Sequence, residues 1–166
     1  MAQGPHSIVI PDTTYVTIPA SPGLDADDAL PWLIDVDVFE QAVSQTGWDT
    51  ININNSAILN GHKNSAGNQN DEIGFDVVLA KGTWTYEMLY TSGSTGGTYS
   101  IRFDGVEIGT LDGYSAGATY NLLHSITGIA VSASAKVRIT LVMATKNASA
   151  TLYRAFLQHI QLRRTA

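Results

Sequence analysis

From Trp48 onward, apolar and polar residues alternate in short runs, which is the pattern of a β-strand with one buried face. In the run 83–90, for example, Trp84, Tyr86 and Met88 share one face. Turn-forming glycine, asparagine and serine residues separate the runs. The pattern predicts strands at residues 48–54, 73–79, 83–90, 98–103, 106–111, 126–131, 137–144 and 152–163.

The clearest local signal is a β-hairpin around Asp104 and Gly105. Both flanking runs, 98–103 and 106–111, alternate and are rich in β-branched and aromatic residues. An Asp-Gly pair tolerates the positive φ angles of a type I′ turn, whose twist matches that of paired strands. We therefore expect a two-residue hairpin at this point.

The composition supports an all-β fold. Only 14% of the residues are charged, there are 15 glycines, and small polar residues are abundant. With 166 residues, the chain is long enough for one domain with a substantial core. We expect an all-β, two-sheet antiparallel β-sandwich of jelly-roll type with an extended N-terminal arm. Its connections are polar loops at 60–71 and 91–97 and a long irregular stretch at 112–125.

The N-terminal part is harder to interpret. Four prolines punctuate residues 1–23, and two short strand-like runs lie between them, at 7–10 and 14–18. Because proline interrupts strand pairing, we expect an extended arm that adds edge strands to its own body or to a neighbour. A loosely attached terminus is the alternative.

Residues 24–45 carry both helical and strand signals. Aspartates and Pro31 suit the start of a helix, whereas the run 32–39 alternates like a strand. We expect short helical turns at 26–30 and 38–45 around an extended middle. The domain boundary is placed here, with the acidic arm and connecting segment at 1–45 and the sandwich at 46–166.

The net charge of −6 is unevenly distributed. Residues 1–45 hold seven acidic residues and no lysine or arginine, whereas the rest of the chain holds eight acidic and nine basic residues. The chain lacks a basic patch that would neutralise phosphates, so we expect no nucleic-acid partner. It has no cysteine, no apolar run long enough for a transmembrane helix, and no signal-peptide pattern at its N-terminus.

No catalytic constellation is recognisable. The histidines, His6, His62, His124 and His159, fall in no nucleophile or zinc-binding motif. Paired carboxylates could serve glycoside hydrolysis, but the candidates cluster in one segment, which favours a solvated or partner-facing role; they are Asp25, Asp27, Asp28, Asp35 and Asp37. Asp25, Asp27 and Asp28 are also possible calcium ligands, although their spacing matches no EF-hand loop. We expect no enzyme activity, no cofactor and no metal.

Sugar binding is the more specific possibility. Flat aromatic side chains stack on sugar rings, and asparagine and aspartate side chains bind hydroxyl groups. The candidates are Tyr99, Tyr114, Tyr120, Trp84 and Asn121. Core packing is the preferred use of Trp84 and its neighbour Tyr86. The loop residues Tyr114, Tyr120 and Asn121 are therefore the predicted ligand contacts, or subunit contacts, where tyrosine is also enriched.

Three segments resemble a known domain. They are residues 97–114, residues 126–131, and the turn 146–149 with the closing strand that ends at 165. In this order they resemble a β-sandwich domain of tailed-bacteriophage virion proteins, which include head decoration proteins and tail-fibre tips. The resemblance covers about residues 72–166.

The resemblance implies a structural or adhesive role on the virion surface, commonly as a homotrimer, without catalytic residues. On this basis the favoured expectation is a trimeric capsid decoration protein that binds the major capsid protein or another virion protein. The alternative is a receptor- or carbohydrate-binding module of a phage tail fibre, whose partner is a host surface glycan. Neither expectation includes a membrane partner.

Overall fold

The computed structural model describes residues 33–36, 42–51, 61–64 and 67–166. These residues form strands and connecting loops and contain no helix; no described helix could therefore cross a membrane. The strands are β1 (Leu33–Val36), β2 (Ala42–Thr46), β3 (Trp48–Ile51), β4 (Gly61–Asn64), β5 (Glu72–Leu79), β6 (Gly82–Ser92), β7 (Gly97–Phe103), β8 (Val106–Asp112), β9 (Thr119–Val131), β10 (Ala135–Lys146) and β11 (Phe156–Arg164).

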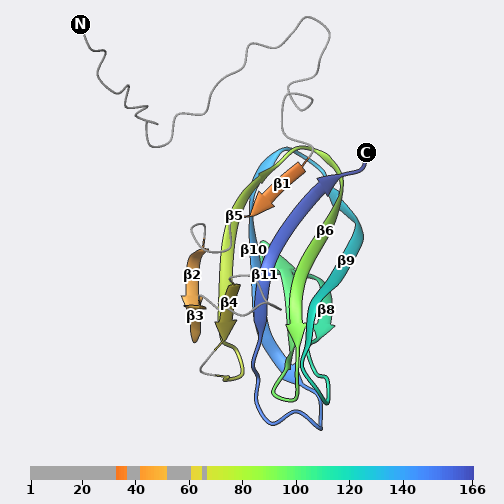
Figure 1. Ribbon diagram of the computed structural model, residues 1–166. Helices are drawn as coiled ribbons and strands as arrows, with labels where there is room; N and C mark the ends of the chain where they lie inside the picture. The colour runs from red at the N-terminus through yellow and green to blue at the C-terminus, as the bar shows by residue number, and fades with distance from the viewer. Residues whose placement is uncertain (1–32, 37–41, 52–60, 65–66) are drawn as a thin grey trace, which may run out of the picture.

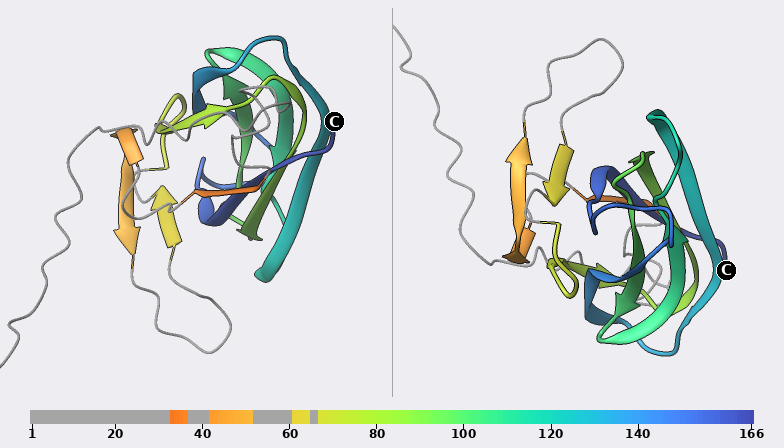
Figure 2. Two further views of the ribbon diagram at one scale, coloured as in Figure 1. Left: turned by 90° about the horizontal axis from the view of Figure 1, so that it is seen from above. Right: turned by 90° about the horizontal axis from the view of Figure 1, so that it is seen from below.

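The strands form two antiparallel sheets. One has the order β3-β4-β11-β6-β9, with β1 also paired to β11, and the other has the order β2-β5-β10-β7-β8. In Figure 1, β11, β6 and β9 lie side by side in front and β10 lies behind them. The end-on views in Figure 2 show the curved strands enclosing a common interior. The predicted fold class, an all-β sandwich of two antiparallel sheets, is confirmed.

The alternating residues of β6 show how the sequence fills this interior. Trp84, Tyr86 and Met88 are fully buried between the sheets. The indole N–H of Trp84 donates to the carbonyl oxygen of Ala80 at 2.9 Å, so its polar group is satisfied. The ring of Tyr86 meets Phe103 edge-on, with centroids 6.3 Å apart. The preferred prediction for Trp84 and Tyr86, core packing, is confirmed.

The central hairpin is also as predicted. Asp104 and Gly105 have φ angles of +47° and +81°, as a type I′ turn requires. The turn is fixed to β10 as well, because the Asp104 carboxylate accepts the backbone N–H of Arg138 at 2.7 Å. The Asp104 N–H in turn donates to the Arg138 carbonyl at 2.8 Å.

The long connection 112–125 was predicted wrongly over its second half. Strand β9 begins at Thr119 and runs antiparallel to β6, with Thr119 opposite Ser92. Asn121 adopts a positive φ of +55°, and the register of the two strands shifts at this point. This irregularity breaks the local alternation, so only the pairing with β6 reveals the strand.

Two further boundaries differ from the prediction. The predicted polar loop at 60–71 contains the short strand β4, which pairs with β3 and with β11. The closing strand β11 begins at Phe156 rather than at 152. The residues before it form a loop, and an isolated β-bridge pairs Arg154 of this loop with Gly96.

Two described strands begin before residue 46. β1 confirms the extended middle of the ambiguous segment, whereas β2 is a strand where a helical turn was predicted for 38–45. The reason is tertiary: β1 pairs with β11, and β2 pairs with β5. The predicted arm 1–23 and the predicted turn at 26–30 lie outside the described residues.

Candidate functional site

Several loops meet at one end of the sandwich, at the bottom of Figure 1. Backbone hydrogen bonds join the β6–β7 loop to the β8–β9 loop: Gly93 N–H donates to Gly113 at 3.1 Å, and Ser115 N–H donates to Gly93 at 3.2 Å. The β10–β11 loop is joined in the same way, by Arg154 N–H to Thr95 at 2.9 Å. Loops tied by backbone bonds hold their side chains in defined positions, so this end is a preorganised surface.

Close packing of the chain also requires glycine here. A Cβ at Gly96 would overlap the carbonyl of Gly113. Below this contact, the buried hydroxyl of Tyr99 accepts the N–H of Phe156 at 3.1 Å and so ties β7 to the start of β11. The core therefore supports the loop end directly.

The loop end carries an open depression of about 210 Å³. Its walls come from three chain segments: the end of β6 with the following loop, the start of β9, and the start of β11 with its preceding loop. The lining residues are Thr91, Ser92, Gly93, Thr95, Gly96, Ala118, Arg154, Ala155 and Phe156. They combine hydroxyl groups, one guanidinium and one aromatic ring, and no acidic group.

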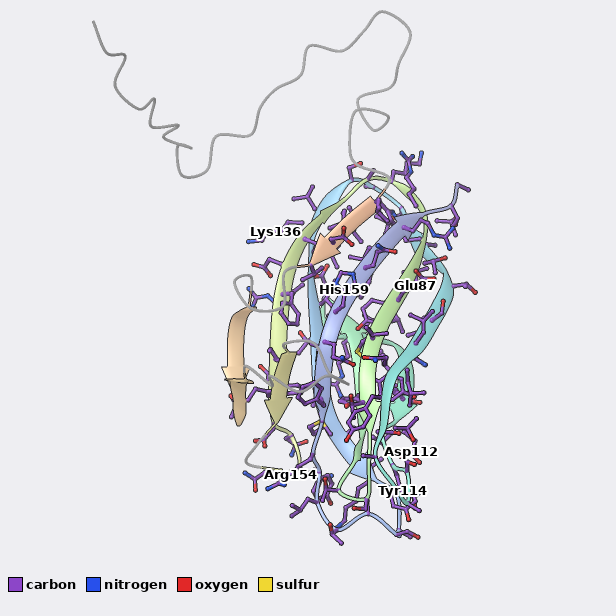
Figure 3. The ribbon with its side chains drawn as sticks, viewed as in Figure 1. Glu87, Asp112, Tyr114, Lys136, Arg154 and His159 are labelled. Carbon is purple, nitrogen blue, oxygen red and sulfur yellow. The ribbon has the colours of Figure 1, made fainter. Side chains whose placement is uncertain are left out.

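Beside the depression, Asp112 organises a polar cluster. One carboxylate oxygen accepts the backbone N–H of Tyr114 at 2.9 Å, and the other accepts the amide of Asn147 at 3.0 Å. Asp112 and Tyr114 lie together at the lower edge of the molecule in Figure 3. Burial, and then the nearby Asp112 charge, raises the pKa of Tyr90 on β6. An exposed carboxylate, an amide and a half-buried tyrosine thus share one edge.

A second polar cluster lies at the start of β9. The buried amide of Gln158 donates to the side-chain oxygen of Asn121 at 2.9 Å, and its oxygen is 3.5 Å from the hydroxyl of Thr91. Because Thr91 lines the depression, this chain of contacts fixes Asn121 next to it. The neighbouring Tyr120 is 39% exposed.

The structure gathers the predicted contacts at one end of the sandwich. Tyr114 is bridged to Gly93, and Asn121 is connected to Thr91 through Gln158, so the two flank the depression. Neither they nor Tyr120 line it directly.

Two other sugar-binding candidates are excluded by burial. The prediction of Tyr99 as a surface contact is wrong, because its ring is buried in the core, and Trp84 is buried as well. Sequence reasoning also missed Asp112 and Asn147. They lie 35 residues apart and meet only through the fold, although each stands in a recognisable turn.

Among the described residues, no group of three histidine, aspartate or glutamate side chains converges as a metal site would require. Burial lowers the pKa of His124 on β9. Asp25, Asp27 and Asp28, which were weighed as calcium ligands, lie outside the described residues. The candidate site is a surface that carries an aromatic side chain, a carboxylate and amides.

Comparison with protein families and with curated proteins gives no match. Solved structures do match. A CBM36 domain of a multidomain xylanase from the hindgut metagenome of Trinervitermes trinervoides is 17% identical, with a TM-score of 0.58 over 81% of this chain and 97% of that one. A family 6 carbohydrate-binding module from Clostridium cellulolyticum, solved with xylose, is 18% identical, with a TM-score of 0.53 over 81% and 96%.

A Paenibacillus xanthan lyase matches with a TM-score of 0.64 and 14% identity over 79% of this chain, which spans 13% of the lyase. At these identities the similarity concerns the fold. The chain therefore shares the jelly-roll β-sandwich of carbohydrate-binding modules, and it spans nearly the full length of those two modules.

Proposed function

We propose that this protein is a non-catalytic carbohydrate-binding module whose loop end recognises a glycan. The observation that carries the proposal is the Asp112 cluster, in which one carboxylate binds the backbone of Tyr114 and the amide of Asn147 on a preorganised surface. The likeness to carbohydrate-binding modules supports it, since the sandwich has the fold on which those modules are built.

Each group has a defined task in this proposal. The ring of Tyr114 packs against the apolar face of a sugar ring, and Asp112 and Asn147 exchange hydrogen bonds with its hydroxyl groups. Asn121, held by Gln158, contacts a neighbouring sugar across the depression. The depression is open, so a stretch of polysaccharide rather than an enclosed small molecule is the expected ligand.

The resemblance to virion β-sandwich domains leads us to place this module on the surface of a bacteriophage particle, with a host surface glycan as ligand. A trimeric capsid decoration protein is the second candidate, favoured by the three segments that carry that resemblance. The structural neighbours support glycan recognition better than decoration. Sedimentation of the protein with purified capsids tests the second candidate: saturable binding supports it, and failure to co-sediment contradicts it.

A glycan array followed by isothermal titration calorimetry tests glycan recognition. We expect Tyr114→Ala and Asp112→Ala to weaken binding at least about 10-fold, because each removes one central contact. The matched control is Lys136→Ala, whose side chain is 63% exposed on β10, away from the loop end. It should bind as the parent does. Absence of any glycan ligand, or parental affinity in both site variants, would contradict the proposal.

A further inference from the structure

The basic side chains of the described chain differ in whether they have an acidic partner. On β10, for example, Arg138 donates to the carboxylate of Asp76 at 3.0 Å. The two basic residues of the β10–β11 loop end, Lys146 and Arg154, form no ion pair with a described residue. Two positive charges at the candidate site are therefore left without an acidic partner from the described chain.

The side chain of Arg154 is held against the protein without a hydrogen-bond acceptor. Its Nε atom is buried, and no described group accepts the N–H. Its stem lies beside the loop before β5, because a Cβ at Gly67 would be 3.3 Å from Arg154 Cγ. Asp71, at the end of that loop, accepts the backbone N–H of Asn68 and does not bind the guanidinium. Burying a charged group without an acceptor costs free energy, and an anion bound to the guanidinium would offset this cost.

Arg154 belongs to the candidate site. Of the described residues that line the depression, it alone is charged. Its backbone is bridged to Gly96, and that of Tyr114 is bridged to Gly93. These two glycines close one turn, since the N–H of Gly96 donates to the Gly93 carbonyl at 2.9 Å. Tyr114 and Arg154 are thus attached to the two ends of the same turn, and Figure 3 shows both at the lower end of the molecule.

Lys146 adds a second cation near this turn. Its Nζ atom lies 5.2 Å from the centre of the Tyr153 ring and 3.4 Å from the carbonyl oxygen of Thr151. The backbone N–H of Thr151 in turn donates to Ser94, in the middle of the turn, at 3.2 Å. Neutral groups therefore place the ammonium on the loop that carries Arg154.

The three loops around the depression are basic, although the chain as a whole has a net charge of −6. The loops are residues 91–97, 112–118 and 146–155. Together they hold two basic residues and one acidic residue. The acidic residue is Asp112, whose carboxylate already accepts the Tyr114 N–H and the Asn147 amide. An anionic ligand at Arg154 would therefore meet a net positive charge.

We propose that the glycan bound at the loop end is acidic, and that Arg154 binds its charged group, a carboxylate or a sulfate ester. The inference rests on the proposed function and adds the class of sugar. The planar guanidinium presents parallel N–H donors to such a group, and a charged pair of this kind is stronger than a neutral hydrogen bond. Lys146 contributes attraction at longer range, while Tyr114 and Asp112 keep their contacts with a sugar ring and its hydroxyl groups.

A glycan array that contains neutral, uronate-bearing and sulfated glycans tests the class of sugar. We expect the bound glycans to carry an acidic group. For the strongest ligand, calorimetry should show affinity at least about 10-fold lower after carboxyl reduction or after desulfation, and the treatment that weakens binding identifies the group. Binding confined to neutral glycans, or affinity unchanged by both treatments, would overturn this inference alone. Absence of any glycan ligand would contradict the proposed function as well.

Substitution of Arg154 tests its role. Arg154→Gln should bind the acidic glycan at least about 10-fold more weakly, and bind its neutralised form within about 2-fold of the parent. Arg154→Lys keeps the charge and most of the stem but loses the planar fork, so its affinity should lie between the two. The matched control is Arg163→Gln, which removes the same charge near the other end of β11, where the side chain is 52% exposed; it should bind as the parent does. Equal loss for the acidic and neutralised glycans in Arg154→Gln, or loss in the control, would overturn the inference.

Discussion

Replacing Gly105 by valine isolates the energy of the central hairpin turn. Gly105 has a φ of +81°, and a Cβ added there would meet no heavy atom within 4 Å. Steric contact with neighbours therefore contributes nothing, and the cost is the strain of a β-branched residue in the left-handed region. That strain is about 1–3 kcal/mol. With the unfolding entropy usual for a domain of this size, Tm should fall by about 3–9 °C.

Thermal and urea unfolding, followed by circular dichroism, measure this change. Gly105→Asn should lose less than about 1 kcal/mol, because asparagine tolerates positive φ. Gly117→Val is the matched control: a Cβ there also meets open space, and its φ lies outside the left-handed region. A valine variant at 105 that unfolds with the parent, or a control that loses as much, would refute the reasoning.

Two further predictions concern other parts of the molecule. Arg138, with a second basic side chain on β10, holds the pKa of Asp76 at about 2. This carboxylate thus adds stability that is present above about pH 4 and lost as pH falls toward 2. In urea unfolding across that range, Asp76→Asn should lose roughly 0.5–1 kcal/mol at neutral pH and converge with the parent in acid. Gly109→Val would put a Cβ 2.7 Å from Ile126 Cδ1, so the variant should lose about 1–3 kcal/mol of unfolding free energy. Adding Ile126→Ala should restore part of this loss. A double variant no more stable than Gly109→Val alone would refute the contact.

Local patterns were sufficient where neighbours in sequence determine the structure. Asp104 and Gly105 specify the hairpin because the backbone preference of two residues fixes the turn type. The alternation in β6 likewise specified a buried face. The same alternation places Tyr99 in line with Ile101 and Phe103, so the pattern already indicated its burial, whereas only its aromatic ring suggested a ligand contact.

The sequence pattern does not predict the structure where pairing between distant strands determines it. The start of β9 follows from its contact with β6, and the local signal is interrupted at Asn121, where the register shifts. β2 is a strand because β5 offers an edge, although its own residues also suit a helix. The site shows the same limit, since Asp112 and Asn147 become neighbours only when two loops meet.

The candidate site lies on loops that the sandwich holds in fixed positions. Strand pairing fixes each loop at its two ends, and the bonds among Gly93, Gly113, Thr95 and Arg154 fix the loops to one another. A ligand that binds such a surface orders little additional chain, so few contacts are needed for measurable affinity. Shallow contacts with a sugar, one ring face and a few hydroxyls, supply little energy individually. A preordered loop end is therefore where such a ligand would bind most effectively.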